Sequence, residues 1–132
     1  MEKLEYIPGD LVMVKKSALQ FAKDKIFKVI SSLSGGFVKV VMLNDSSTTY
    51  SISNNAIRPI PLTPEILEKN GWREEKGDYI NDNYHIKLCE KIDGYSAYKV
   101  VNDTIVWLRD VRSVSDLQHL LFGLGINQEM EV

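Results

Sequence analysis

The stretch Arg58-Pro-Ile-Pro-Leu-Thr-Pro-Glu-Ile-Leu-Glu-Lys-Asn-Gly-Trp72 separates two parts of the chain that differ in pattern. Its three prolines, at positions 59, 61 and 64, remove three backbone donors and favour an extended chain. Thr63 then predicts a helix N-cap, with Pro64 at the first helical position and Asn70-Gly71 at the helix end. We expect a junction between two halves here, with Trp72 buried between them.

Length and composition are those of an ordinary globular protein. The chain has 132 residues, enough for one domain or two very small ones, and 44% of them are hydrophobic. No apolar run approaches the roughly 20 residues that cross a bilayer, and the N-terminal residues lack the apolar region of a signal peptide. Because Cys89 is the single cysteine, it cannot form an internal disulfide. We therefore expect a reducing, intracellular location and no membrane contact.

Charge is unevenly distributed along the chain. Residues 1–60 carry eight Lys and Arg against five Asp and Glu (+3), whereas residues 61–132 carry eight against thirteen (−5). A balance of +3 permits contact with a phosphate backbone but does not require it, since dedicated nucleic-acid binders have dense basic patches. Nucleic-acid binding by the first half is therefore an open alternative.

Short apolar and alternating runs predict five strands in the first half. The expected strands are residues 11–14, 25–33, 37–43, 48–53 and 57–60. A long loop, residues 15–24, follows the first strand, and a tight helical turn at residues 54–56 precedes the last. Gly9-Asp10-Leu11-Val12-Met13-Val14 and Asn54-Asn55-Ala56-Ile57-Arg58-Pro59 resemble the SH3-like barrels of ribosomal and transcription-factor KOW modules. A KOW segment would place a glycine where this chain has Lys15-Lys16-Ser17, so the resemblance does not extend to RNA binding of the KOW kind.

The second half is predicted to be a helix, an antiparallel meander and a second helix. After a charged turn at residues 73–78, we expect strands over residues 79–83, 84–90, 95–101 and 104–111. Strand 104–111 has apolar side chains on both faces, which is typical of a central strand covered on both sides. Ser113-Val-Ser-Asp116 predicts a capping box. The helix after it has one apolar stripe and a polar tail, the stripe being Val114, Leu117, Leu120, Leu121 and Leu124.

The predicted fold is thus mainly β with an α+β C-terminal part: an SH3-like five-stranded barrel, residues 1–61, packed on the helix–meander–helix unit, residues 62–132. The segments at residues 59–72 and 114–124, with a strand meander between them, resemble small uncharacterised proteins of phage, prophage and mobile elements in gut bacteria of the Bacteroides type. The resemblance covers residues 57–126. It implies a source in a phage or mobile element, and hence the cytoplasm of a bacterial host or the virion. In that group a His often occupies the position of Asp116.

Candidate catalytic and metal-binding residues are few. His85 and Cys89 lie four apart on one predicted strand, so their separation is about 13 Å, too far for a nucleophile and its base. Zinc needs three or four converging ligands, and His119 is on a different element. The acidic residues of the turns have the pattern of solvated loop charges: Glu74, Glu75, Asp78, Asp82, Asp93 and Asp103. We expect no catalytic site, no cofactor and no metal.

The sequence therefore favours a non-enzymatic protein-binding module that acts on a host or phage protein of unknown identity. Loops on a rigid scaffold commonly carry binding residues. The candidate contacts are the side chains of the long loop and two residues of the last helix: Lys15, Lys16, Leu19, Phe21, Lys23, Lys25, His119 and Phe122. Two alternatives stay open, a nucleic-acid binder that uses the basic loop and a component of the virion or its assembly.

Overall fold

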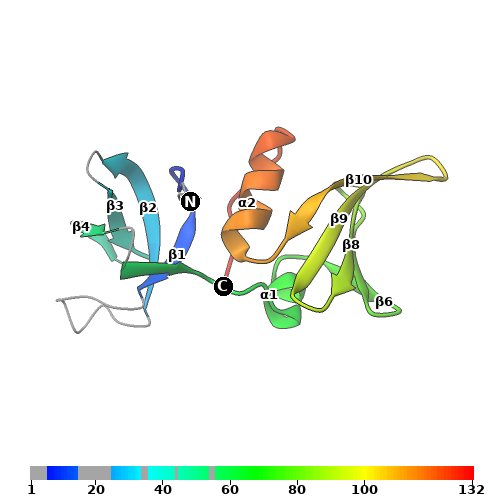
Figure 1. The fold of residues 1–132 in the computed structure, drawn as a ribbon, viewed down its shortest axis with the longest axis horizontal. Coiled ribbons are helices and arrows are strands. Elements are labelled where there is room, and N and C mark those ends of the chain that lie inside the picture. The colour runs from blue at the N-terminus through cyan, green and yellow to red at the C-terminus, as the bar shows by residue number, and fades with distance from the viewer. Residues whose placement is uncertain (1–5, 15–24, 34–35, 44, 54–55) are drawn as a thin grey trace. The chain divides into compact units, whose positions relative to one another are not determined.

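The structure, a computed structural model, describes residues 6–14, 25–33, 36–43, 45–53 and 56–132. The chain is mainly β, with two antiparallel sheets and helices in its second half (Figure 1). It divides into two compact units, Met1–Ile60 and Pro61–Val132, which are described here one at a time as unit 1 and unit 2.

Unit 1 contains one antiparallel sheet of five strands. These are β1 (Leu11–Val14), β2 (Ile26–Leu33), β3 (Phe37–Met42), β4 (Asp45–Ser53) and β5 (Ile57–Pro59), in the order β4-β3-β2-β1-β5. The predicted barrel closure is wrong for the described residues, since β4 and β5 are the edges of an open sheet. The short β5 ends at Pro59, which has no backbone donor with which to extend pairing.

The core of unit 1 is formed by side chains that alternate inward along these strands. The largest fully buried one is Phe27, which meets Tyr50 edge to face with ring centroids 6.0 Å apart. Around them pack Tyr6, Val12, Val14, Val29, Val38, Val40, Ile52 and Ile57.

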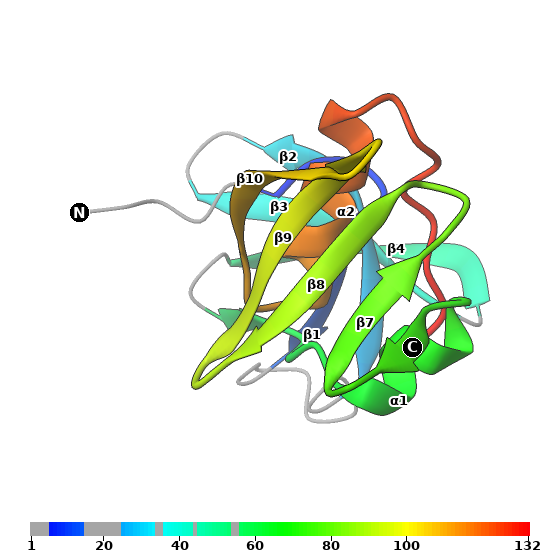
Figure 2. The same ribbon diagram turned by 90° about the vertical axis from the view of Figure 1, so that its right-hand side faces the viewer.

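Unit 2 contains a five-stranded antiparallel meander and two helices. The elements are α1 (Pro64–Lys69), β6 (Arg73–Glu75), β7 (Asp78–Asn81), β8 (Ile86–Lys91), β9 (Gly94–Val101), β10 (Thr104–Val111) and α2 (Val114–Gly123). The strand order is β10-β9-β8-β7-β6. Figure 1 places α1 and α2 on one side of this sheet, and Figure 2 looks onto it from the other side.

The predicted first helix is confirmed with its caps. The Thr63 hydroxyl accepts a hydrogen bond from the backbone N–H of Ile66 (3.3 Å), and Gly71 ends the helix at φ +86°. The N–H of Trp72 donates to the carbonyl of Leu67 at 3.0 Å, and its ring is 4% exposed. Its aromatic neighbour is Tyr84, at 6.4 Å. The burial of Trp72 is confirmed, whereas its place between the halves stays a prediction.

The predicted second helix is also confirmed. Ser113 Oγ accepts from the N–H of Asp116 at 3.1 Å, and the Asp116 carboxylate accepts from the N–H of Arg112 at 3.0 Å. The apolar stripe is buried from Val114 to Leu121, but Leu124 is exposed because it is the C-cap, beyond the last turn.

The tail after α2 is held against α1. The side-chain amide of Asn70 donates to the carbonyl of Glu131 at 2.7 Å and accepts from its N–H at 2.8 Å. The buried Gln118 donates to the carbonyl of Gln128 at 3.1 Å. Two side-chain amides thus pair with backbone groups of the tail, as a neighbouring strand would.

Two expectations for the meander are wrong. Residues 73–78 are not one charged turn, because Arg73–Glu75 pairs with β7 through a two-residue turn at Lys76-Gly77. Both turn residues have positive φ, 55° and 89°, the conformation of a type I′ hairpin turn. Nor is strand β10 central. It is an edge of the sheet, and its N-terminal half is exposed.

Candidate functional site

The loop residues predicted to bind a partner fall largely outside the described residues, since Lys15, Lys16, Leu19, Phe21 and Lys23 all lie between residues 15 and 24.

The remaining predicted contacts are described, and two of them share a helix. Lys25 is exposed before β2. On α2, His119 is half-buried and Phe122 is 61% exposed, three residues further along the same side of the helix. The exposed Leu124 follows them as the C-cap of α2.

A larger surface lies on the side of the unit 2 sheet that points away from the helices, here called the open face. Alternation along each strand sends Tyr79, Leu88 and Ala97 into the core and sends their neighbours to the open face. One row of directly opposed residues crosses all five strands on that face, about 19 Å in length at the usual strand spacing. The row is Arg73, Ile80, Lys87, Tyr98 and Trp107.

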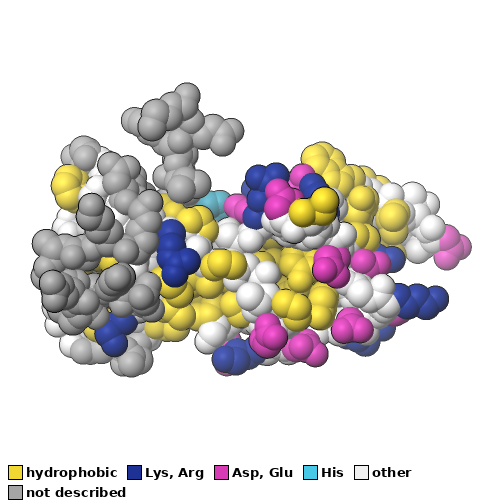
Figure 3. Space-filling model, turned by 60° about the horizontal axis from the view of Figure 1, so that its bottom comes forward, with side chains coloured by type: hydrophobic (Ala, Val, Ile, Leu, Met, Phe, Trp, Pro, Cys, Tyr) yellow, Lys and Arg dark blue, Asp and Glu magenta, His cyan; other side chains and the backbone are white. Residues whose placement is uncertain are grey.

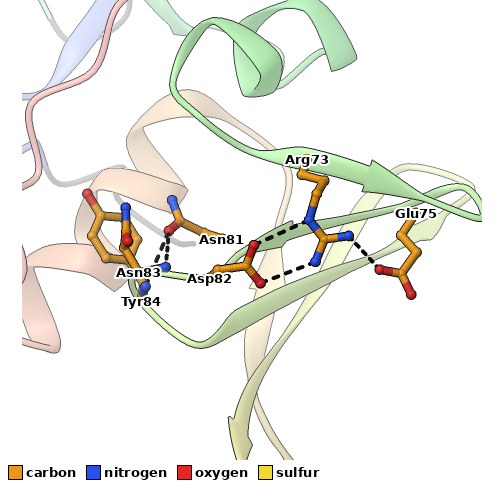
Figure 4. A network of polar contacts seen from close by, with 6 residues as sticks. All are labelled: Arg73, Glu75, Asn81, Asp82, Asn83 and Tyr84. Atoms are coloured by element: carbon orange, nitrogen blue, oxygen red, sulfur yellow. Dashed lines mark hydrogen bonds and ion pairs between the residues drawn. The ribbon is translucent and has the colours of Figure 1, made fainter.

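Carboxylates pair with the cations at the β6 end of this row. Figure 4 shows the Arg73 guanidinium between Asp82, which it meets at 3.2 Å and 3.3 Å, and Glu75, at 2.6 Å. Its hydrogen bonds lower the pKa of both carboxylates, and the same contacts raise the pKa of Arg73. Lys87 Nζ lies 3.6 Å from Asp78 Oδ2. The cations of the row are therefore already neutralised within the protein.

A second polar group borders the β10 end of the row. Lys91 Nζ lies 2.9 Å from Asp110 Oδ2, and Ser96 Oγ donates to Asp110 Oδ1 at 3.0 Å. These two hydrogen bonds, that of Lys91 foremost, hold the pKa of Asp110 below its usual value. The Trp107 side chain contributes, least of the causes, to the same lowering of the Asp110 pKa.

A concave site of about 310 Å³ opens beside the row. Its apolar walls are Ile80, Val100 and Ile105, from three different strands. Polar side chains form the rest of the lining: Arg73, Asn81, Asp82, His85 and Lys87. The turn that bounds it is ordered by Asn81 Oδ1, which accepts from two backbone N–H groups (Figure 4).

The hairpin of β9 and β10 extends the apolar surface beyond this concave site. Ile105, Val106 and Trp107 are 52%, 51% and 57% exposed, and Val101, opposite Thr104, is exposed as well. Over the part of the molecule that contains this sheet, Figure 3 shows hydrophobic surface interrupted by acidic and basic side chains. An exposed apolar surface with a polar surround is typical of a protein contact site.

The candidate nucleophile and metal ligands do not converge. His85 is not on a strand as predicted but in the turn before β8, exposed and at φ +56°. Burial, and then the neighbouring Asp78 carboxylate, raise the pKa of the half-buried Cys89 thiol, which disfavours the reactive thiolate. Among the described residues, no three His, Cys, Asp or Glu side chains are grouped closely enough to hold a metal ion.

The sequence analysis did not identify the open face. Its residues come from five strands, and only the pairing register brings them into one row. The sequence signal for it is strand 104–111, whose apolar residues on both faces predict a central strand but belong to an edge strand in the structure.

Comparison with known proteins gives no assignment: no family model matches the chain, and no curated protein matches it. Within the described part of the chain, neither helix has the length and apolar character needed to span a membrane.

Proposed function

We propose that this chain is a non-enzymatic protein-binding module and that its contact surface is the open face of the unit 2 sheet with the β9–β10 hairpin. The observation that carries the proposal is the exposure of Ile105, Val106 and Trp107 in one strand. Large aromatic and aliphatic side chains beside a concave site are the usual anchors of protein interfaces. The concave site could receive one aliphatic side chain of the partner against Ile80 and Val100.

The charges of the open face favour a protein over a nucleic acid. Each cation described there already has a carboxylate partner. A phosphate backbone would have to displace these carboxylates, whereas a protein surface can add hydrogen bonds around an apolar centre.

We further propose that the chain acts for a phage or mobile element, in the cytoplasm of a bacterial host or as part of a virion. The support is the resemblance of residues 57–126 to proteins of such elements. Unit 1 would then be an SH3-like module in an open form, supported by its five-strand order and by the 3₁₀ residue Ala56 before β5. Unit 1 and unit 2 would then each offer a binding surface, and the two surfaces could contact different partner proteins.

Affinity capture from host extract tests the proposed surface. The chain as bait should retain one protein in stoichiometric amount, and the variants Trp107→Ser and Ile80→Ser should lose it. The matched control is Ile92→Ser, because Ile92 is a fully exposed apolar residue on a different turn of the same sheet. Equal capture by all four baits would contradict the assignment of the open face.

A salt titration tests the nucleic-acid alternative directly. If Lys15, Lys16, Lys23 and Lys25 neutralised about four phosphates, the log–log salt slope on duplex DNA would be near −3.6. We expect no specific binding of duplex or single-stranded probes at about 150 mM salt. Sub-micromolar binding that is lost when the four lysines become glutamates would replace the protein-binding proposal.

A further inference from the structure

Residues 126–132, here called the tail, lie along the helices of unit 2 in the manner of a bound peptide (Figure 2). Exposure alternates along them, which is typical of an extended chain with one face on a surface. The half-buried residues are Ile126, Gln128, Met130 and Val132, and the exposed ones are Asn127, Glu129 and Glu131. Because the tail is not a strand of either sheet, its backbone groups need other partners.

Two side-chain amides supply such partners. Asn70, at the end of α1, donates to the carbonyl of Glu131 at 2.7 Å and accepts from the N–H of the same residue at 2.8 Å. A residue in an antiparallel sheet exchanges the same two bonds with the residue opposite it. On α2, the fully buried Gln118 donates to the carbonyl of Gln128 at 3.1 Å. Both helices therefore hold the backbone of the tail, and these contacts do not depend on its side chains.

We propose that Asn70, Gln118 and the adjoining surface of α1 and α2 form a groove for an extended peptide segment of a partner protein, and that the tail occupies this groove until such a segment displaces it. The amide contacts select an extended backbone. The half-buried positions of Ile126, Met130 and Val132 select apolar side chains at alternate positions of the segment. The groove belongs to the helices, so it is a second contact surface that does not depend on the open face.

The contacts of the tail are of a kind that a competing segment can replace. The hydrogen bonds from Asn70 to Glu131 and from Lys69 to the carbonyl of Val132 are exposed, so water competes for them. A concave space of about 430 Å³ remains between Met130 and the end of α1, so the tail does not fill the surface that it covers. Release of the tail breaks no hydrogen bond of the sheet, and the groove can therefore open while unit 2 stays folded.

Fluorescence polarisation with a labelled peptide of residues 125–132 tests the inference on the full chain. The tethered tail competes with the peptide, so a chain with the tail substitutions Ile126→Ser and Met130→Ser should bind it at least about tenfold more tightly than the wild type. Adding Asn70→Ala to that chain should weaken binding at least about tenfold, because two hydrogen bonds are lost. The matched control is Asn83→Ala, which replaces an exposed asparagine in the turn before β8 and should leave binding unchanged.

Variants of the peptide test which features the groove recognises. Serine in place of Ile126 and Met130 should weaken binding of the peptide at least about tenfold, because the apolar contacts are lost. Glutamine in place of Glu129 and Glu131 should change it by no more than about threefold, because both side chains are exposed in the tail.

Hydrogen exchange provides a test that needs no substitution. In the wild type, excess unlabelled peptide should speed exchange of the chain's own Glu131 N–H, which Asn70 protects. No binding to the chain with the substituted tail, binding insensitive to Asn70→Ala, or exchange unchanged by the peptide would show that the tail is a fixed part of the fold. A wild-type dimer that is lost when Ile126 and Met130 become serine would assign the groove to the tail of a second copy and overturn the partner segment. None of these outcomes alters capture through the open face, so the proposed function is tested separately.

Discussion

The two tryptophans of the chain provide a matched pair of substitutions in the same unit. Trp72 is 4% exposed and meets Tyr84 edge to face, whereas Trp107 is mostly exposed at the sheet edge. Trp72→Ala should cost about 3–5 kcal/mol of unfolding free energy, of which the lost aromatic contact accounts for about 0.5–1.5 kcal/mol. Trp107→Ala should change the stability of the monomer by no more than about 0.5 kcal/mol.

Urea unfolding at low protein concentration measures both effects. Because both tryptophans are in unit 2, the fluorescence of the remaining one reports the unfolding of that unit in each variant. A shift of the unit 1 transition in Trp72→Ala, followed by far-UV circular dichroism because unit 1 has no tryptophan, would support the predicted packing of Trp72 between the halves. A cost below about 1 kcal/mol for Trp72→Ala, or equal costs for the two variants, would refute the assigned burial.

Three further predictions concern unit 2. Cys89→Ser should fold with little loss of stability, and Asp78→Asn should speed alkylation of Cys89, because the Asp78 carboxylate raises the pKa of the thiol. Gly94→Ala should cost more than about 1 kcal/mol in urea unfolding, since its Cβ would lie 2.7 Å from a backbone oxygen. Gly123→Ala, whose Cβ would meet open space, should be neutral or stabilising by up to about 1 kcal/mol in the same measurement. The pKa of Asp110 is lowered in the folded state, so its contribution to stability is present above the ordinary value of 3.8 and is lost as the pH falls below it; Asp110→Asn should reduce that acid sensitivity in pH-dependent unfolding.

Helix ends were predictable from the sequence because their chemistry is local. Thr63 and Ser113 accept hydrogen bonds from N–H groups three residues on, and this depends only on neighbouring residues. The same holds for Gly71, which adopts the left-handed conformation that ends a helix. For this reason both helices were found with their caps.

Turns were harder to predict where their residues are atypical. The turn at Asn102-Asp103 was expected, and Asn102 does have positive φ, 54°. Lys76-Gly77 forms a similar turn, but lysine is an uncommon residue at its first position, so the sequence pattern predicts a loop where the strand Arg73–Glu75 forms. Because Arg73 belongs to this strand, the sequence pattern does not predict its place in the row of the open face.

The error at strand 104–111 shows why the candidate site could not be predicted. A strand with apolar residues on both faces either lies inside a sheet, covered by its own chain, or lies at an edge and awaits another chain. Periodicity is the same in both cases, because it reports which side chains avoid water and not what covers them. The structure shows the second case. β10 is the last strand of the meander, and among the described strands only β9 pairs with it. Its exposed apolar residues therefore need a covering surface that this sheet does not supply, and this requirement motivates the proposed binding function.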